Sequence, residues 1–231
     1  MSQDPIVVVS MSVREVMAEV RLSSMAESVG GTVAHLQLGD PSLSRELTRL
    51  ADDGAERITV VGVGLGSLAP AVSWLRRVAA HWWRERPEPR PLLDVATRLV
   101  KDEALLSEVL AETRPVSGDE AGLVSAAWED VPQHRHQLLI CRGPRCTALG
   151  SDLTAEAFVL AMMARGLGDD DVLITHTGCQ FPCNQAPVVS VQPDDVWYGA
   201  VDPGTARTIV DEHLVAGRPL GSHRLPRRRR D

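Results

Sequence analysis

The chain has 231 residues, of which 44% are hydrophobic and 24% charged, and its formal net charge is −7. This length allows one large or two ordinary domains with a real core, and the composition excludes a wholly disordered chain. The largest basic cluster is the terminal run from Arg227 to Arg230, whereas nucleic-acid binders more often carry a basic stripe across the folded body. We therefore expect small-molecule or protein partners and no nucleic acid.

The sequence also bears on the cellular compartment. Residues 1–12 lack the positive region and the long apolar stretch of a signal peptide, and no run of about 18 apolar residues occurs. We expect a soluble, cytoplasmic protein with no membrane span. In a reducing cytosol, its four cysteines are expected to bind a metal or to act in redox chemistry rather than to form disulfides.

Strands and helices alternate in the first part of the chain. Residues 5–12 form an apolar, β-branched run that is typical of a strand buried on both faces, and residues 13–30 have helical spacing. Further strands are predicted at 32–39, 56–64 and 92–100, with helices at 41–54, 69–86 and 102–113. This order predicts an α/β domain at residues 1–112, with a parallel sheet flanked by helices on both faces.

Residues 113–135 are rich in proline, glycine and acidic residues, which predicts a linker. A second α/β domain is expected at residues 136–220. It has predicted strands at 137–141 and 171–177, a hairpin at 186–201, and helices at 154–167 and 203–217. Residues 221–231 are expected to be a basic, disordered tail.

All four cysteines lie in the second domain, as two close pairs. Cys141 and Cys146 have four residues between them, and Cys179 and Cys183 have three. Each pair begins where a predicted strand ends. If these strands are parallel neighbours, their carboxyl ends share one edge of the sheet, and two loops can bring four thiolates around one site. Thiolates suit zinc and iron–sulfur clusters.

The spacing leaves other interpretations open. The four residues are rarely unrelated buried cysteines when they fall in two close pairs on loops. A zinc ion held as a structural staple is compatible with the spacing. Catalytic disulfide exchange of the thioredoxin type is disfavoured because the sequence has no C-x-x-C motif.

Two stretches carry a specific resemblance: CRGPRC at residues 141–146 and TGCQFPCNQAPVV at residues 177–189. They resemble the thioredoxin-like 2Fe-2S ferredoxins and the equivalent domain of the small peripheral subunit of respiratory NADH dehydrogenase. The resemblance extends from about His136 to Leu220. It implies a thioredoxin-like fold that often dimerises, and a 2Fe-2S cluster bound by Cys141, Cys146, Cys179 and Cys183.

Residues beside these cysteines have expected roles in the same site. Gly143 and Gly178 would let the backbone approach the cluster closely. Arg142 and Arg145 flank the first pair, and as a hypothesis they raise the reduction potential or dock an acidic partner. Ordinary solvated loop arginines are an equally open interpretation.

The first domain carries a weaker motif, the glycines Gly62, Gly64 and Gly66 between a strand and a helix. A dinucleotide-binding loop needs G-x-G-x-x-G, which this stretch lacks, so close packing or a tight turn is the favoured interpretation. His35 is the only histidine before His81, and in a strand pattern it is expected to be a satisfied core residue.

Residues 5–112 resemble the small class II chelatases that insert cobalt or iron into sirohydrochlorin. That family has one metal-handling histidine just after its first strand and another after its third. Here the first place reads Ser10-Met11-Ser12 and the second falls near Leu68 to Pro70. Because a chelatase needs a basic group to bind metal and take pyrrole protons, we expect a chelatase-like domain that is not catalytic.

The leading hypothesis is an electron carrier that passes single electrons between a reductase and an acceptor enzyme, or a subunit of a larger oxidoreductase. An electron-transfer protein or an oxidoreductase subunit is favoured over a free-standing enzyme. A link with cobalamin or siroheme metabolism is inferred by association. The alternative is a sirohydrochlorin-type chelatase with a regulatory iron–sulfur cluster.

Overall fold

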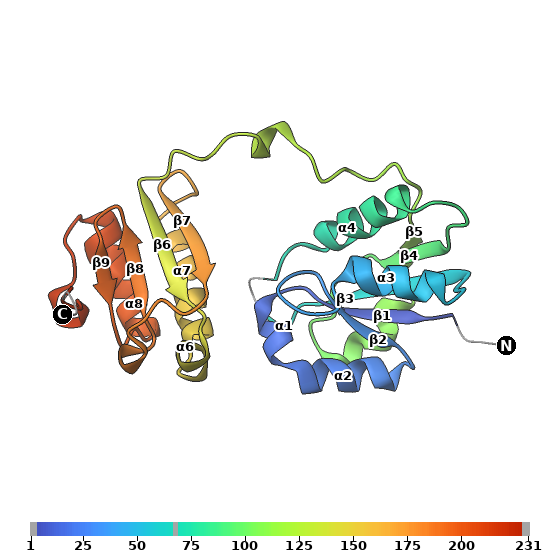
Figure 1. Cartoon of the computed structure of the whole chain (residues 1–231), viewed down its shortest axis with the longest axis horizontal. Coiled ribbons are helices and arrows are strands. Elements are labelled where there is room, and N and C mark those ends of the chain that lie inside the picture. The colour runs from blue at the N-terminus through green and yellow to red at the C-terminus, as the bar shows by residue number, and fades with distance from the viewer. Residues whose placement is uncertain (1–3, 67–68, 228–231) are drawn as a thin grey trace, which may run out of the picture. The chain divides into compact units, whose positions relative to one another are not determined.

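The structure is a computed structural model that describes residues 4–66 and 69–227. The chain is a mixed α/β protein that divides into two compact units, Met1–Trp128 and Glu129–Asp231. Figure 1 shows a separate sheet with its own helices in each of them. Within the described residues, no helix is long and apolar enough to cross a membrane.

The first unit is built on a five-stranded sheet with the order β2-β1-β3-β4-β5. Its strands are β1 (Ile6–Ser10), β2 (Thr32–His35), β3 (Arg57–Val63), β4 (Leu92–Ala96) and β5 (Thr113–Pro115). Its helices are α1 (Val13–Met17), α2 (Glu19–Ser28), α3 (Leu43–Asp52), α4 (Val72–Glu85) and α5 (Leu106–Leu110), with short 3-10 turns η1 (Glu103–Leu105) and η2 (Ala126–Trp128).

Alternate residues of the central strands supply two separate cores. Val7 and Val9 of β1 pack in one cluster with apolar residues of α3 and α4, whereas Val8 packs in another with those of α2 and α5. Successive side chains of a strand point to opposite faces, so a continuous run of valines buries both sides of the sheet. The predicted parallel sheet with two covered faces is confirmed for β1 to β4.

Two details of the first unit differ from the sequence prediction. The single helix expected at 13–30 is divided into α1 and α2 at Ala18. Thr113–Pro115, expected to open the linker, forms β5 and pairs antiparallel with β4. Such a short edge strand leaves little pattern in a sequence, and its proline is tolerated because an edge strand needs few ladder hydrogen bonds.

The second unit has a four-stranded sheet with the order β7-β6-β8-β9. Its strands are β6 (His136–Cys141), β7 (Val172–Thr177), β8 (Val189–Gln192) and β9 (Val196–Tyr198). Its helices are α6 (Pro144–Ala148), α7 (Ser151–Ala164) and α8 (Pro203–Ile209), which continues as a π-helical segment η4 (Val210–Val215); η3 (Cys183–Gln185) and η5 (Gly221–His223) are 3-10 turns.

Apolar residues of α7, α8 and η4 pack in one core with Leu138, Ile140 and Val189 of the sheet. The strands β6 and β7 are parallel, and β8 and β9 form the expected hairpin. The tail predicted at 221–231 is described as far as Arg227, and its described part lies along β9. Residues 228–231 lie outside the described residues.

Candidate functional site

The two cysteine pairs start at the same edge of the second sheet. Cys141 is the last residue of β6 and pairs with Thr177, the last residue of β7, so Cys179 follows only two residues beyond that partner. Cys146 lies in α6, and Cys183 begins the turn η3. The prediction that both pairs begin at the ends of neighbouring parallel strands is confirmed.

The loops that carry the two pairs touch each other. A Cβ atom placed on Gly143 would lie 3.0 Å from both Cα and Cβ of Cys179, so only glycine allows this approach without a shift. The amide of Arg142 donates to the carbonyl of Thr177 at 2.8 Å. Nη1 of Arg145 donates to Oδ1 of Asn184 at 2.7 Å. Gly178 is different, because a Cβ atom there would meet open space.

The four thiols differ in their exposure. Cys141 and Cys146 are 1% and 2% exposed and form a small apolar cluster with Val188, against which Trp197 packs. Cys179 is exposed and Cys183 is partly exposed. One side of the site is therefore buried and the other faces solvent.

The second pair is in close contact, with Sγ of Cys179 3.2 Å from Sγ of Cys183. A hydrogen bond from the backbone amide of Phe181 lowers the pKa of Cys179, and the positive charge of Arg145 contributes to the same effect. The pKa of Cys183 shifts in the opposite direction, because contact with Cys179 raises it.

Cys146, in the first pair, resists ionisation. Burial raises the pKa of Cys146 to about 11, and proximity to Cys141 and Cys183 raises it as well. Sulfurs of the two loops thus interact with one another across the site. Four thiolates this close repel each other, so the set is stable in its ionised form only around cations.

This donor set can be compared with the possible metal groups. Among the residues that the structure describes, no group of three or more His, Cys, Asp or Glu side chains is arranged to hold a metal ion. A 2Fe-2S cluster distributes four thiolates over two irons instead of gathering them on one. Four converging thiols on two loops, with a glycine at the point of contact, fit such a cluster.

The two arginines have different surroundings. Arg145 is exposed and joins the loops through Asn184. Arg142 is partly buried, its Nη1 donates to the carbonyl of Ser151 at 3.0 Å, and burial lowers its pKa. Of the two expected flanking charges, Arg145 is the one on the surface.

Several residues of the site were not singled out in the sequence. Gln180, between the second pair of cysteines, donates to Oγ1 of Thr177 at 2.8 Å and accepts from the hydroxyl of Ser190 at 3.1 Å. Ser190 is fully buried in strand β8, between the buried Val189 and Val191. A buried hydroxyl needs a partner, so this serine was the available signal that a polar loop covers the strand.

Backbone amides of the glycine-rich loop in the first unit donate hydrogen bonds to a side chain of the same unit. The carboxylate of Glu15, which is fully buried, accepts hydrogen bonds from the amides of Leu65 at 2.8 Å and Gly66 at 3.3 Å. These are amides that a nucleotide phosphate would use. A Cβ on Gly62 would lie 2.7 Å from Leu99, which bears out the interpretation of close packing.

His35 is buried, and its Nδ1 lies 2.7 Å from the hydroxyl of Ser10. This bears out the expectation of a satisfied core histidine. His35 and Ser10 both lie at the carboxyl edge of the sheet. Burial lowers the pKa of His35, so its ring takes up a proton less readily than a solvated histidine does. The second position at which the chelatase family has a histidine, near Leu68 to Pro70, lies partly outside the described residues.

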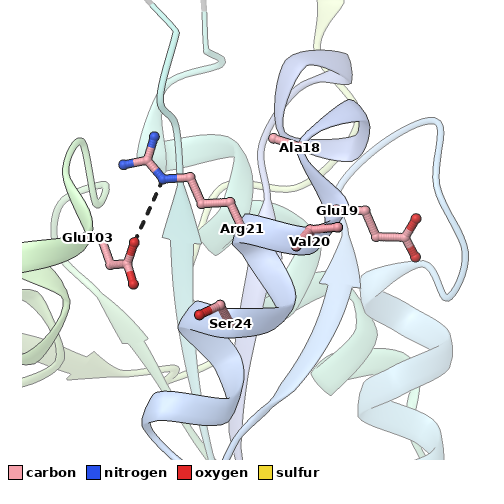
Figure 2. A pocket seen from close by; sticks show the side chains of 6 residues that line it. All are labelled: Ala18, Glu19, Val20, Arg21, Ser24 and Glu103. Carbon is pink, nitrogen blue, oxygen red and sulfur yellow. Dashed lines mark ion pairs between the residues drawn. The ribbon is translucent and has the colours of Figure 1, made fainter.

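A surface pocket of about 620 Å³ also belongs to the first unit (Figure 2). It is lined by Ala18, Glu19, Val20, Arg21, Ser24 and Glu103. Arg21 and Glu103 form an ion pair of 3.8 Å across it, and both are about half exposed. Two mutually paired, solvated charges of this kind do not form a polarised catalytic group.

Comparisons with known proteins concern part of the chain. No family model matches it. It is 39% identical over 75 residues to a 2Fe-2S ferredoxin of Aquifex aeolicus, which covers 32% of this chain and 68% of that protein. It is 31% identical over 91 residues to a 2Fe-2S ferredoxin of Clostridium pasteurianum, covering 36% of this chain and 88% of that protein.

Among solved structures, the crystal structure of the wild-type thioredoxin-like [2Fe-2S] ferredoxin from Aquifex aeolicus matches with 32% identity and a TM-score of 0.37. The match covers 40% of this chain and 97% of that one. Through the homology that extends over about a third of its length, the chain belongs to the 2Fe-2S ferredoxin family.

Proposed function

We propose that this protein is an electron carrier in which Cys141, Cys146, Cys179 and Cys183 bind one 2Fe-2S cluster. The observation that carries the proposal is the convergence of two loops, each with two thiols, at the shared end of β6 and β7. The ferredoxin relatives support the same cofactor. When bound, the cluster supplies reversible transfer of one electron.

The residues of this chain hold the cluster and set its surroundings. The amide of Phe181 donates toward Cys179, and the charge of Arg145 lies nearby. Both favour a more negative site, and therefore stabilise the reduced state. Cys141 and Cys146 anchor the buried side, while Cys179 and Cys183 leave the other side open to a redox partner.

The wider expectations remain proposals. We propose a cytoplasmic location and two protein partners, a reductase that donates electrons and an oxidoreductase that accepts them. Homodimer formation and a link with cobalamin or siroheme metabolism are further expectations from the sequence. The chelatase-like character of residues 1–112, without catalysis, is proposed on the resemblance stated above.

Anaerobic purification followed by optical and EPR spectroscopy tests the proposal. A 2Fe-2S protein is red-brown, its visible bands bleach with dithionite, and the reduced form gives an EPR signal. Iron and acid-labile sulfide should be equal, at two each per chain. A colourless protein that contains one zinc and no iron would show that the cysteines form a structural metal site instead.

A further inference from the structure

The segment 221–227, here called the C-terminal strap, pairs with the free edge of β9. The amide of Leu225 donates to the carbonyl of Trp197 at 2.7 Å, and the amide of Gly199 donates to the carbonyl of His223 at 3.0 Å. An antiparallel bridge joins Tyr198 to Arg224. The strap therefore continues the sheet of the second unit past its last strand.

One side chain of β9 connects the strap with the buried cysteines. Trp197 packs against the apolar cluster of Cys141, Cys146 and Val188. On the strap, the guanidinium of Arg227 lies 5.8 Å from the centre of the Trp197 ring and forms an ion pair with Asp195. The indole is thus held between the cysteine site and the strap.

A second connection runs through Gly199 to the other cysteine loop. A Cβ atom on Gly199 would lie 2.8 Å from Cβ of Gln185 and 3.0 Å from Cδ2 of Leu225. Gln185 ends the turn that begins at Cys183, and its carbonyl accepts the amide of Ala200 at 2.7 Å. Leu225 and the turn that begins at Cys183 therefore both lie against the position that a side chain of Gly199 would occupy.

We propose that the C-terminal strap is the outer wall of the cysteine site. It holds Trp197 over Cys141 and Cys146 and braces the Cys183 turn through Gly199, so that it limits the access of water and reagents to the thiols and to the bound cluster. Trp197, Gly199 and Leu225 act as positioning residues. The effect on the cluster rests on the proposed function, whereas the shielding of the thiols does not.

The first test uses the reduced protein without metal and the thiol reagent DTNB. Because Cys141 and Cys146 are buried and the other two thiols are at least partly exposed, we expect two fast and two slow reactions. Truncation after Leu220 should accelerate the slow reactions by about tenfold or more, because their opening no longer requires release of the strap. Truncation after Arg227 keeps the strap and should leave the rates unchanged.

Two point variants distinguish the loss of the strap contacts from general unfolding of the protein. Leu225→Ala loosens the strap without altering its charge, and Gly199→Ala forces apart the strap and the Cys183 turn. Both should retain the circular dichroism spectrum of the wild type and should speed the slow thiols. Unchanged slow rates in the folded truncation and in both variants would overturn the proposal, whether or not the protein binds a cluster.

The second test uses the protein with its cluster. Leu225→Ala should raise the reduction potential, since additional water stabilises the more negative reduced state, and it should shorten the lifetime of the chromophore in a chelator. If the wild type has no chromophore, the proposed function fails and the DTNB result still decides the role of the strap. If the wild type has one and neither property changes in the variant, the strap does not shield the cluster.

Discussion

The guanidinium of Arg145 donates to the side-chain oxygen of Asn184 at 2.7 Å and joins the two loops that carry the cysteines. The pKa of Cys179 is lowered chiefly by the hydrogen bond from the amide of Phe181, and the positive charge of Arg145 adds to this effect. One side chain therefore links the loops mechanically and favours negative charge on the exposed sulfur. The two effects can be separated by substitution.

We expect Arg145→Gln to lower the reduction potential of the cluster, because the reduced state loses a nearby positive charge. One charge at about 4 Å in a solvated setting is worth about 1 kcal/mol, or about 40 mV for one electron. Redox titration followed by visible absorption measures the change. Arg207→Gln, on the surface of α8, removes the same charge elsewhere and serves as control. An equal shift in both variants would mean that only net charge matters.

Gly143 and Gly178 provide a matched pair for testing the contact between the loops. Gly143→Ala places a methyl group 3.0 Å from the backbone of Cys179, whereas Gly178→Ala meets no atom within 4 Å. We expect the first variant to bind less iron after reconstitution and to lose its chromophore faster, and the second to behave as the wild type. Iron content and the rate of bleaching check this. Equal losses in both variants would contradict the assigned contact.

Glu15 gives a prediction for the first unit. Its carboxylate accepts from the amides of Ser12, Leu65 and Gly66 and ties two loops together. Glu15→Ala leaves one buried and two partly buried amides without this partner, so we expect a loss of about 2 kcal/mol in the free energy of unfolding. Urea denaturation measures it. Glu27→Ala, on the exposed side of α2, should change the stability by a few tenths of a kcal/mol.

The sequence correctly predicts those elements of the fold that have a characteristic pattern of neighbouring residues. Uninterrupted valines in β1 indicate a strand buried on both faces, and the positions of Cys141 and Cys179 after strands predict their convergence. For the C-terminal strap, the polar and basic sequence of residues 221–231 predicts disorder instead. The strap pairs through backbone hydrogen bonds, and these leave no trace in the choice of side chains.

The contacts that shape the cysteine site are likewise non-local. Arg145 meets Asn184 across 39 positions of sequence, and Trp197 packs against the cluster that contains Cys141 from a strand at the other side of β8. No periodicity encodes such pairs. A buried polar residue such as Ser190 is the kind of local signal that does survive, because it requires a partner.

The last prediction concerns pH. His213 is buried; its Nδ1 lies 2.8 Å from the hydroxyl of Tyr198, and its Nε2 lies 2.9 Å from Asp194. Burial lowers the pKa of His213 below 6.5, although Asp194 opposes this; the charges of His136 and Arg224 act in the same direction as burial. The folded state therefore favours the neutral ring, and the unfolded chain takes up the proton first as the pH falls.

Because the pKa of His213 is lowered in the folded state, its contribution to stability is fully present above pH 6.5. This contribution is lost as the pH falls from 6.5 through the lower pKa of the folded state. We expect His213→Gln to lose less stability than the wild type between pH 7.5 and pH 5.5. Urea denaturation of the protein without metal measures this, so that acid loss of a cluster does not contribute. A steeper loss of stability in the variant than in the wild type would mean that the fold favours protonated His213 through Asp194.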